Sequence, residues 1–223
     1  MKNEFLLADR ETAEDLQAFL LRAKRMDADG LVRFRAYGQV LAAYVAPIFA
    51  GSLMDSGPTV IGLRTCELAN DTEVEALVPI AAVLDRLARV LETDLWHAKD
   101  SKIVLPENSR AAWAGITPPR AGWLQVDTLN ETLLTEIAKA GITEVAQTLP
   151  EAVGGPIAAR IRGSIWGRAI EMGSKVPTGA AFVAAGLGFL TEKEDIAVYE
   201  VDNWVRLSSM HGHVIARVAN DSL

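Results

Sequence analysis

The stretch that decides the fold is TGAAFVAAGLGFL, Thr178–Leu190. It is apolar on every side, which predicts a buried helix rather than an amphipathic surface helix. It is too short to cross a membrane, which takes about 20 apolar residues, and it carries no side chain able to do chemistry. We therefore predict that this helix is the packing centre of a C-terminal lobe.

The chain after this helix alternates between apolar and polar residues. The alternating runs are Ile196–Val201, Trp204–Ser208 and His213–Val218, and tight turns at Asp202-Asn203 and Met210-His211-Gly212 separate them. Short alternating runs joined by tight turns are typical of antiparallel hairpins. The tail is therefore predicted to be a three-stranded meander.

The chain before the buried helix is expected to be helical. Thr128-Leu-Asn-Glu131 matches a capping box and predicts a helix start. Gly141 is expected to end that helix, and Thr143–Leu149 is expected to form a short second one. Gly154-Gly155-Pro156 introduces a third helix.

The N-terminal part mixes helices with an antiparallel meander. Residues 11–26 place apolar side chains at helical spacing, and Val78 before Pro79 favours a strand that passes directly into a helix. The predicted strands are Leu31–Tyr37, Val40–Ile48, Thr59–Leu68 and Glu73–Val78, and the second helix is Pro79–Leu91.

These patterns predict an α+β fold in which helices pack on small antiparallel sheets in two lobes. Residues 1–98 are expected to form the N-terminal lobe, and residues 128–223 a helical lobe that ends in a β-meander. The Trp/Pro-rich residues 99–127 are expected to connect them. Alternatively, the two meanders share one sheet and the chain is a single domain.

Composition limits the classes of partner and compartment. Half of the 223 residues are hydrophobic and 23% are charged, as in ordinary globular proteins. The net charge of −7 disfavours nucleic acid and anionic membranes as partners. The single cysteine, Cys66, fits a reducing cytoplasm. The apolar run Phe5–Ala8 is too short for a signal peptide or a membrane span.

The most unusual local feature is the segment from Trp113 to Trp123, WAGITPPRAGW. Trp and Arg dominate binding energy at protein interfaces, and Arg stacks on indole rings. The segment is therefore predicted to be an interaction surface, although the tryptophans could instead fix a long loop to the core. The candidate contact residues are Arg110, Trp113, Pro118, Pro119, Arg120 and Trp123.

No other constellation predicts catalysis, a metal or a cofactor. His211 and His213 lie two residues apart, but the only other histidine is His97, and a zinc site takes three or four ligands. Cys66 lies in a strand-like run without a base that the sequence could place beside it. We expect no catalytic residue, no metal and no cofactor.

Glu131–Gln147 partly resembles a helix-turn-helix motif, with Gly141 at the turn. Its details do not fit, because Ile137 stands where a small residue is usual and the second helix carries Glu144 but no Lys or Arg. An acidic recognition helix would repel phosphate. DNA binding is therefore the least favoured interpretation.

Three segments carry a resemblance: GLRT at Gly62–Thr65, the Trp113–Trp123 segment, and VPTGAAFVAAGLGFL at Val176–Leu190. On these residues the chain resembles uncharacterised proteins of high-GC Gram-positive (actinobacterial) bacteria. The resemblance implies a bacterial cytoplasmic setting and brings no known activity or site.

The leading hypothesis is a non-catalytic cytoplasmic protein that binds a protein partner or associates with itself. The alternative is a small-molecule binder or enzyme with a pocket between the lobes, and a further alternative is a DNA-binding protein. Polar groups for such a pocket would come from Arg64, Asp85, Arg86 and Arg89.

Overall fold

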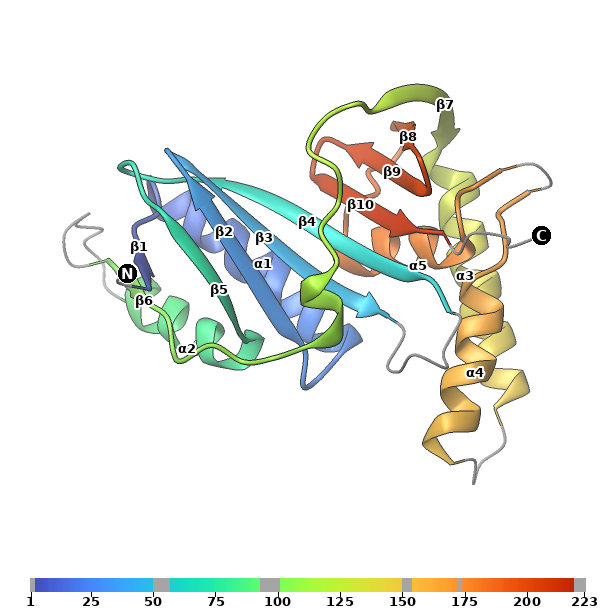
Figure 1. The fold of residues 1–223 in the computed structure, drawn as a ribbon, viewed down its shortest axis with the longest axis horizontal. Coiled ribbons are helices and arrows are strands. Elements are labelled where there is room, and N and C mark those ends of the chain that lie inside the picture. The colour runs from blue at the N-terminus through green and yellow to red at the C-terminus, as the bar shows by residue number, and fades with distance from the viewer. Residues whose placement is uncertain (1–2, 50–56, 93–100, 150–153, 172–173, 219–223) are drawn as a thin grey trace. The chain divides into compact units, whose positions relative to one another are not determined.

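The computed structural model describes residues 3–49, 57–92, 101–149, 154–171 and 174–218. The chain forms two compact units, coloured by residue number in Figure 1. Unit 1 comprises Met1–Pro47 and Leu63–Ala114, and unit 2 comprises Ile48–Gly62 and Gly115–Leu223.

Unit 1 contains the predicted N-terminal elements, with bounds close to those expected. They are β1 (Glu4–Phe5), α1 (Arg10–Met26), β2 (Leu31–Tyr37), β3 (Val40–Ile48), the second half of β4 (Thr59–Glu67), β5 (Val74–Pro79), α2 (Ile80–Leu91), β6 (Ile103–Val104) and the 3-10 turn η1 (Ala112–Gly115). The strand order is β5-β2-β3-β4, and β2 runs antiparallel to both β3 and β5.

Buried and more exposed side chains alternate along β2, and this alternation shows which face of the sheet is buried in the core. Phe34 is fully buried and its ring lies 5.2 Å from that of Phe5. Arg33 and Arg35, its neighbours on either side, point to the opposite face because successive strand residues alternate. Helices α1 and α2 pack against each other and contribute further buried apolar side chains to the core of the unit. The second face is therefore free to carry charge.

Unit 2 combines three helices with strands of a sheet. Its elements are β7 (Leu124–Asn130), α3 (Glu131–Thr148), α4 (Gly155–Trp166), α5 (Thr178–Leu187), β8 (Asp195–Val201), β9 (Trp204–Ser209) and β10 (Gly212–Arg217). In this sheet β7 pairs with β8, β8 with β9 and β9 with β10, each antiparallel, and the first half of β4 lies beside β10. The predicted terminal meander is confirmed, and among the described strands β7 is the last one of the sheet.

The buried helix expected at Thr178–Leu190 is α5. Gly188 ends it in the left-handed conformation, at φ 72°, which glycine adopts without steric cost. Most of its side chains are buried, but Ala185 is exposed, so the helix is covered on most sides rather than on all of them.

The expected helix break at Gly141 is wrong, because α3 is one continuous helix from Glu131 to Thr148. Its N-cap is Asn130, whose side chain accepts a hydrogen bond from the backbone N–H of Thr132, and Thr128 belongs to β7. A helix-turn-helix needs a turn between two helices, so the continuous α3 excludes that interpretation.

Gly141 is explained by packing rather than by helix termination. A Cβ there would lie 2.3 Å from Cζ3 of Trp166 in α4. The Trp166 ring is in turn stacked on Phe182 of α5, at 4.5 Å between centroids. The glycine therefore lets three helices approach each other around one tryptophan.

Candidate functional site

The six predicted interaction residues are divided between the two units. Arg110 and Trp113 belong to unit 1, whereas Pro118, Pro119, Arg120 and Trp123 belong to unit 2. Each group has its own surroundings.

In unit 1, the segment before Trp113 covers part of the outer edge of β5. The N–H of Leu77 donates to Oδ1 of Asn108 at 3.2 Å, and the N–H of Ser109 donates to the carbonyl of Leu77 at 2.7 Å. Trp113 is buried, with 4% of its surface exposed. In this structure it holds the segment to the core, which is the packing role that the sequence left open.

A surface cavity of about 280 Å³ lies beside this segment. It is lined by Arg33, Glu75, Leu77, Asn108, Arg110 and Ala114, among others. Nε of Arg33 lies 2.7 Å from one carboxylate oxygen of Glu75, and Nε of Arg35 lies 2.6 Å from the other. Two guanidinium groups thus share one carboxylate, and the exposed Arg110 adds a third positive charge.

In unit 2, the Pro118–Trp123 loop is closed on itself. The indole N–H of Trp123 donates to the carbonyl of Pro119 at 3.0 Å, and Gly122 takes φ 85° to allow the turn. The two prolines are half-buried and Arg120 is exposed. The loop therefore presents Arg120 on a backbone that is fixed at both ends.

The arginine that stacks on Trp123 is Arg206 of β9, which the sequence interpretation missed. Its guanidinium lies 4.7 Å from the Trp123 ring and 4.4 Å from the ring of Tyr199, its cross-strand neighbour on β8. Nε of Arg206 is buried and has no hydrogen-bond partner among the described residues. Burial lowers the pKa of Arg206 from its usual value. The period-2 pattern of Trp204–Ser208 could have placed Arg206 on a strand face, but not opposite Tyr199.

The strand that follows this loop, β7, is exposed along almost its whole length. Only Leu129 is buried, while Leu124 and Val126 are 71% and 53% exposed. The register with β8 shifts between Gln125 and Asp127, which makes Val126 the extra residue of a β-bulge.

The histidine pair does not form a metal site within the described part of the chain. His211 lies in the turn before β10, and His213 is on the strand with Nδ1 3.0 Å from Oγ of Ser208. Burial, and secondarily the charge of Arg206, lower the pKa of His213. His97 lies outside the described residues, and those described contain no group of three metal-binding side chains.

Cys66 is buried, and burial raises its pKa to about 12. Its thiol therefore stays protonated at neutral pH, whereas a nucleophilic cysteine must reach the thiolate form. The carboxylate of Asp15 raises this pKa further, and Asp15 is itself paired with Arg64.

Two of the four polar groups expected to line a pocket between the lobes, Arg64 and Arg86, have other partners. Arg64 pairs with Asp15, and Arg86 donates to the backbone carbonyls of Ala82 and Val104. These bonds hold α1 to β4 and α2 to β6 within unit 1. The existence of an inter-lobe pocket stays a prediction.

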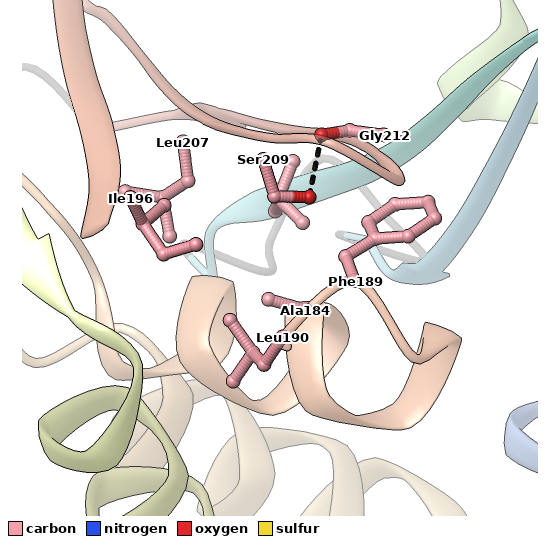
Figure 2. Close-up of a pocket in the computed structure, with 8 residues that line it drawn as sticks. Ala184, Phe189, Leu190, Ile196, Leu207, Ser209 and Gly212 are labelled. Atoms are coloured by element: carbon pink, nitrogen blue, oxygen red, sulfur yellow. Dashed lines mark hydrogen bonds between the residues drawn. The ribbon is translucent and has the colours of Figure 1, made fainter. Parts of the chain in front are cut away.

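A second, much smaller cavity lies between α5 and the sheet of unit 2 (Figure 2). Its volume is about 10 Å³, enough for one water molecule, and apolar side chains such as Phe189, Ile196 and Leu207 line it. The hydroxyl of Ser209 donates to the carbonyl of Gly212 at 3.2 Å (Figure 2). The cavity is therefore a packing void and offers a ligand no free polar group.

Two family comparisons cover nearly all of the chain. Residues 1–113 match the family described as "Domain of unknown function (DUF8010)", and residues 118–221 match "Domain of unknown function (DUF8185)". The expectation of an uncharacterised family is thereby confirmed, while an actinobacterial origin stays a prediction. Among curated proteins, none matches the sequence.

Solved structures with a similar fold are sliding clamps of DNA polymerase III. The DnaN sliding clamp (subunit beta) from Bartonella birtlesii matches with a TM-score of 0.54 at 9% identity, over 99% of this chain and 66% of that one. The subunit from Borrelia burgdorferi gives 0.54 at 6%, over 98% and 65%. That from Pseudomonas aeruginosa gives 0.51 at 12%, over 100% and 66%.

The likeness at such low identity shows the fold alone: helices with antiparallel sheets, as in a sliding clamp. It confirms the predicted α+β class. The chain spans just under two thirds of the length of these clamp subunits. No helix among the described residues is long and apolar enough to cross a membrane.

Proposed function

We propose that this chain, which belongs to the DUF8010 family of unknown function, is a non-catalytic protein that binds another protein chain through one surface of unit 2. We call this the β7 surface: the Pro118–Trp123 loop, strand β7 and the Arg206 stack. The observation that carries the proposal is the exposure of β7, the last described strand of its sheet, with two large apolar side chains facing solvent.

An edge strand has unpaired N–H and C=O groups along its outer side, and these can pair with a strand of another chain. Leu124 and Val126 would add buried apolar area on such pairing. The bulge at Val126 interrupts regular pairing and limits the contact to short stretches on either side of it. The strand is thus suited to a specific partner rather than to indiscriminate aggregation.

The adjoining loop supports the same proposal. Binding is weakened when a loop must be ordered, and the Trp123–Pro119 hydrogen bond and the two prolines order this loop in advance. We include Pro118, Pro119, Arg120 and Trp123 in the contact surface. Arg110 of unit 1 is not part of the β7 surface, and we propose it as a separate contact residue that Trp113 supports from the core.

The partner is a second copy of this chain or a different protein. Likeness to sliding clamps, which their names describe as subunits of a polymerase, favours a role in an assembly. We propose a bacterial cytoplasmic setting, as the sequence suggested.

The experiment compares the wild-type chain with Val126→Lys. Lysine on an edge strand blocks strand pairing, and Val126 is exposed enough for the change to leave folding intact. Native mass spectrometry and affinity capture should show the partner or dimer with wild type and at least tenfold less with Val126→Lys. The control Ala146→Lys, at an exposed position of α3, should behave as wild type. A Val126→Lys variant that retained full association would refute the proposal.

The alternative function, a binder of small molecules, is favoured by the cavity in unit 1. Its excess of positive charge over Glu75 suits a small anion, such as a carboxylate or phosphate. Inorganic phosphate and citrate titrated against wild type and Arg110→Met would test it. If wild type and Arg110→Met bound the anions with equal affinity, or if neither bound them, the cavity would not be an anion-binding site.

DNA binding is the further alternative, and we propose that it is absent. The net charge of −7 opposes it, and α3 carries three acidic residues against one lysine. Binding of mixed-sequence duplex DNA at low salt, with affinity falling steeply as salt rises, would overturn this.

A further inference from the structure

The guanidinium of Arg206 is partly buried, yet it has neither an ion-pair partner nor a hydrogen bond at Nε among the described residues. Its guanidinium carbon lies over two rings, 4.7 Å from the centre of the Trp123 ring and 4.4 Å from that of Tyr199. Its Nε is buried without a partner, while the terminal nitrogens are not among the buried unpartnered atoms of the described residues. The stack therefore leaves one edge of the group, the fork of terminal nitrogens, for an incoming ligand.

The charge of Arg206 is not balanced within the described part of the chain. None of the ion pairs found there involves it. Glu200 follows Tyr199 on β8 and therefore points to the opposite face, where it lies 2.7 Å from Nζ of Lys175. An unpaired, partly desolvated cation in a protein of net charge −7 is costly, and an anionic ligand would remove that cost.

His213 completes the polar surroundings. It lies opposite Ser208 in the β9–β10 register, and its Nδ1 is 3.0 Å from the serine hydroxyl. Ser208 shares its strand face with Arg206, two residues away. Because the histidine pKa is lowered, the imidazole is neutral at neutral pH and contributes hydrogen-bonding capacity without a second charge.

One guanidinium fork beside a neutral imidazole matches a monoanion, and a planar carboxylate fits the fork with two parallel hydrogen bonds. The flanking Trp123 and Tyr199 rings give apolar area for the chain that carries the carboxylate, since Trp, Tyr and Arg are the residues that dominate interface hot spots. We infer that the Arg206 fork binds an Asp or Glu carboxylate of an acidic peptide segment. This inference rests on the proposed interaction function and names the chemistry of the partner.

The test titrates the full chain with a capped peptide of alternating Gly and Glu, and with the same peptide carrying Gln instead of Glu. The readout is the indole N–H resonance of Trp123 in an NMR spectrum, assigned with a Trp123→Phe variant. The Glu peptide should shift this resonance, more weakly as salt rises, and the Gln peptide should not. Arg206→Met, which keeps a long stacking side chain but removes the fork, should lose at least tenfold in affinity.

Three comparisons separate binding from a merely structural stack. Arg206→Lys keeps the charge without the fork and should bind with intermediate affinity. Arg168→Met, at an exposed arginine paired with Glu144, should bind as wild type. The melting temperature of Arg206→Met reports any loss of folding separately from the affinity.

The inference is overturned if the Gln peptide binds equally or if Arg206→Met retains its affinity. Tighter binding of inorganic phosphate than of the Glu peptide would also overturn it, since the site would then be a phosphate site. The capture experiment with Val126→Lys tests the interaction function without Arg206. A failed titration beside a successful capture would therefore refute the carboxylate site alone.

Discussion

Replacing Gly141 by alanine sets two effects against each other. Alanine in a helix interior is favoured over glycine by about 0.8–1.0 kcal/mol, so a helix considered by itself would be stabilised. In this fold, however, the new Cβ would lie 2.3 Å from Cζ3 and 2.7 Å from Cη2 of Trp166. Carbon atoms in good contact are about 3.5–4.0 Å apart.

The clash cannot be relieved cheaply. Trp166 is 5% exposed, and its ring is stacked on Phe182 at 4.5 Å, so moving it away from α3 disturbs α5 as well. Overpacking of this kind costs about 1–3 kcal/mol, and the short distances place this case at the upper end. We therefore expect a net destabilisation of about 1–2 kcal/mol after the helix propensity is subtracted.

Thermal and urea unfolding followed by circular dichroism measure the effect. The melting temperature should fall by about 2–8 °C for a chain of this size. The control is Gly155→Ala, at the start of α4, where a Cβ would meet nothing within 4 Å and stability should hardly change. In a Trp166→Leu background, Gly141→Ala should become stabilising. A Gly141→Ala chain that was more stable than wild type would show that Trp166 does not pack there.

Cys66 and His213 give two further predictions. Cys66 is the single cysteine, and burial raises its pKa to about 12, so Ellman's reagent should react at neutral pH only after the chain unfolds. A stoichiometric reaction with the folded chain would contradict the burial of this thiol. His213 has a folded-state pKa below 6.5, so the unfolded chain binds more protons and stability should fall as the pH drops from above 6.5 towards the folded pKa. Melting temperatures on both sides of 6.5 should show a larger fall for wild type than for His213→Asn, and identical falls would remove the histidine as the cause.

Local pattern was sufficient for most elements of the fold. The all-apolar Thr178–Leu190 stretch predicted a buried helix, and the alternation of Leu31–Tyr37 predicted a strand with one buried face. In the helix the absence of a polar side requires burial on most sides, and in the strand the alternation determines which face is buried. The division of the chain at residues 98 and 128 stays a prediction.

Gly141 and Arg206 show where local pattern failed, because the reason for each residue lies far away in the sequence. Gly141 has the sequence signature of a helix end, and only the presence of Trp166 explains a glycine inside a helix. No local sequence pattern distinguishes Arg206 from the other arginines. Its role depends on Tyr199 of β8 and Trp123 of the loop, whose rings lie next to it only in the folded chain. The sequence identified Trp123 as a partner for an arginine, but it could not identify which one.

Association through the β7 surface can be observed by site-specific photo-cross-linking at Val126. A photoreactive amino acid would replace Val126 in the full chain expressed in cells, and Ala146, exposed on α3, would carry it in the control. We expect one discrete covalent adduct from Val126, of a second copy or of one other protein, and none from the position of Ala146. No adduct from Val126, or the same adducts from both positions, would contradict association through this surface.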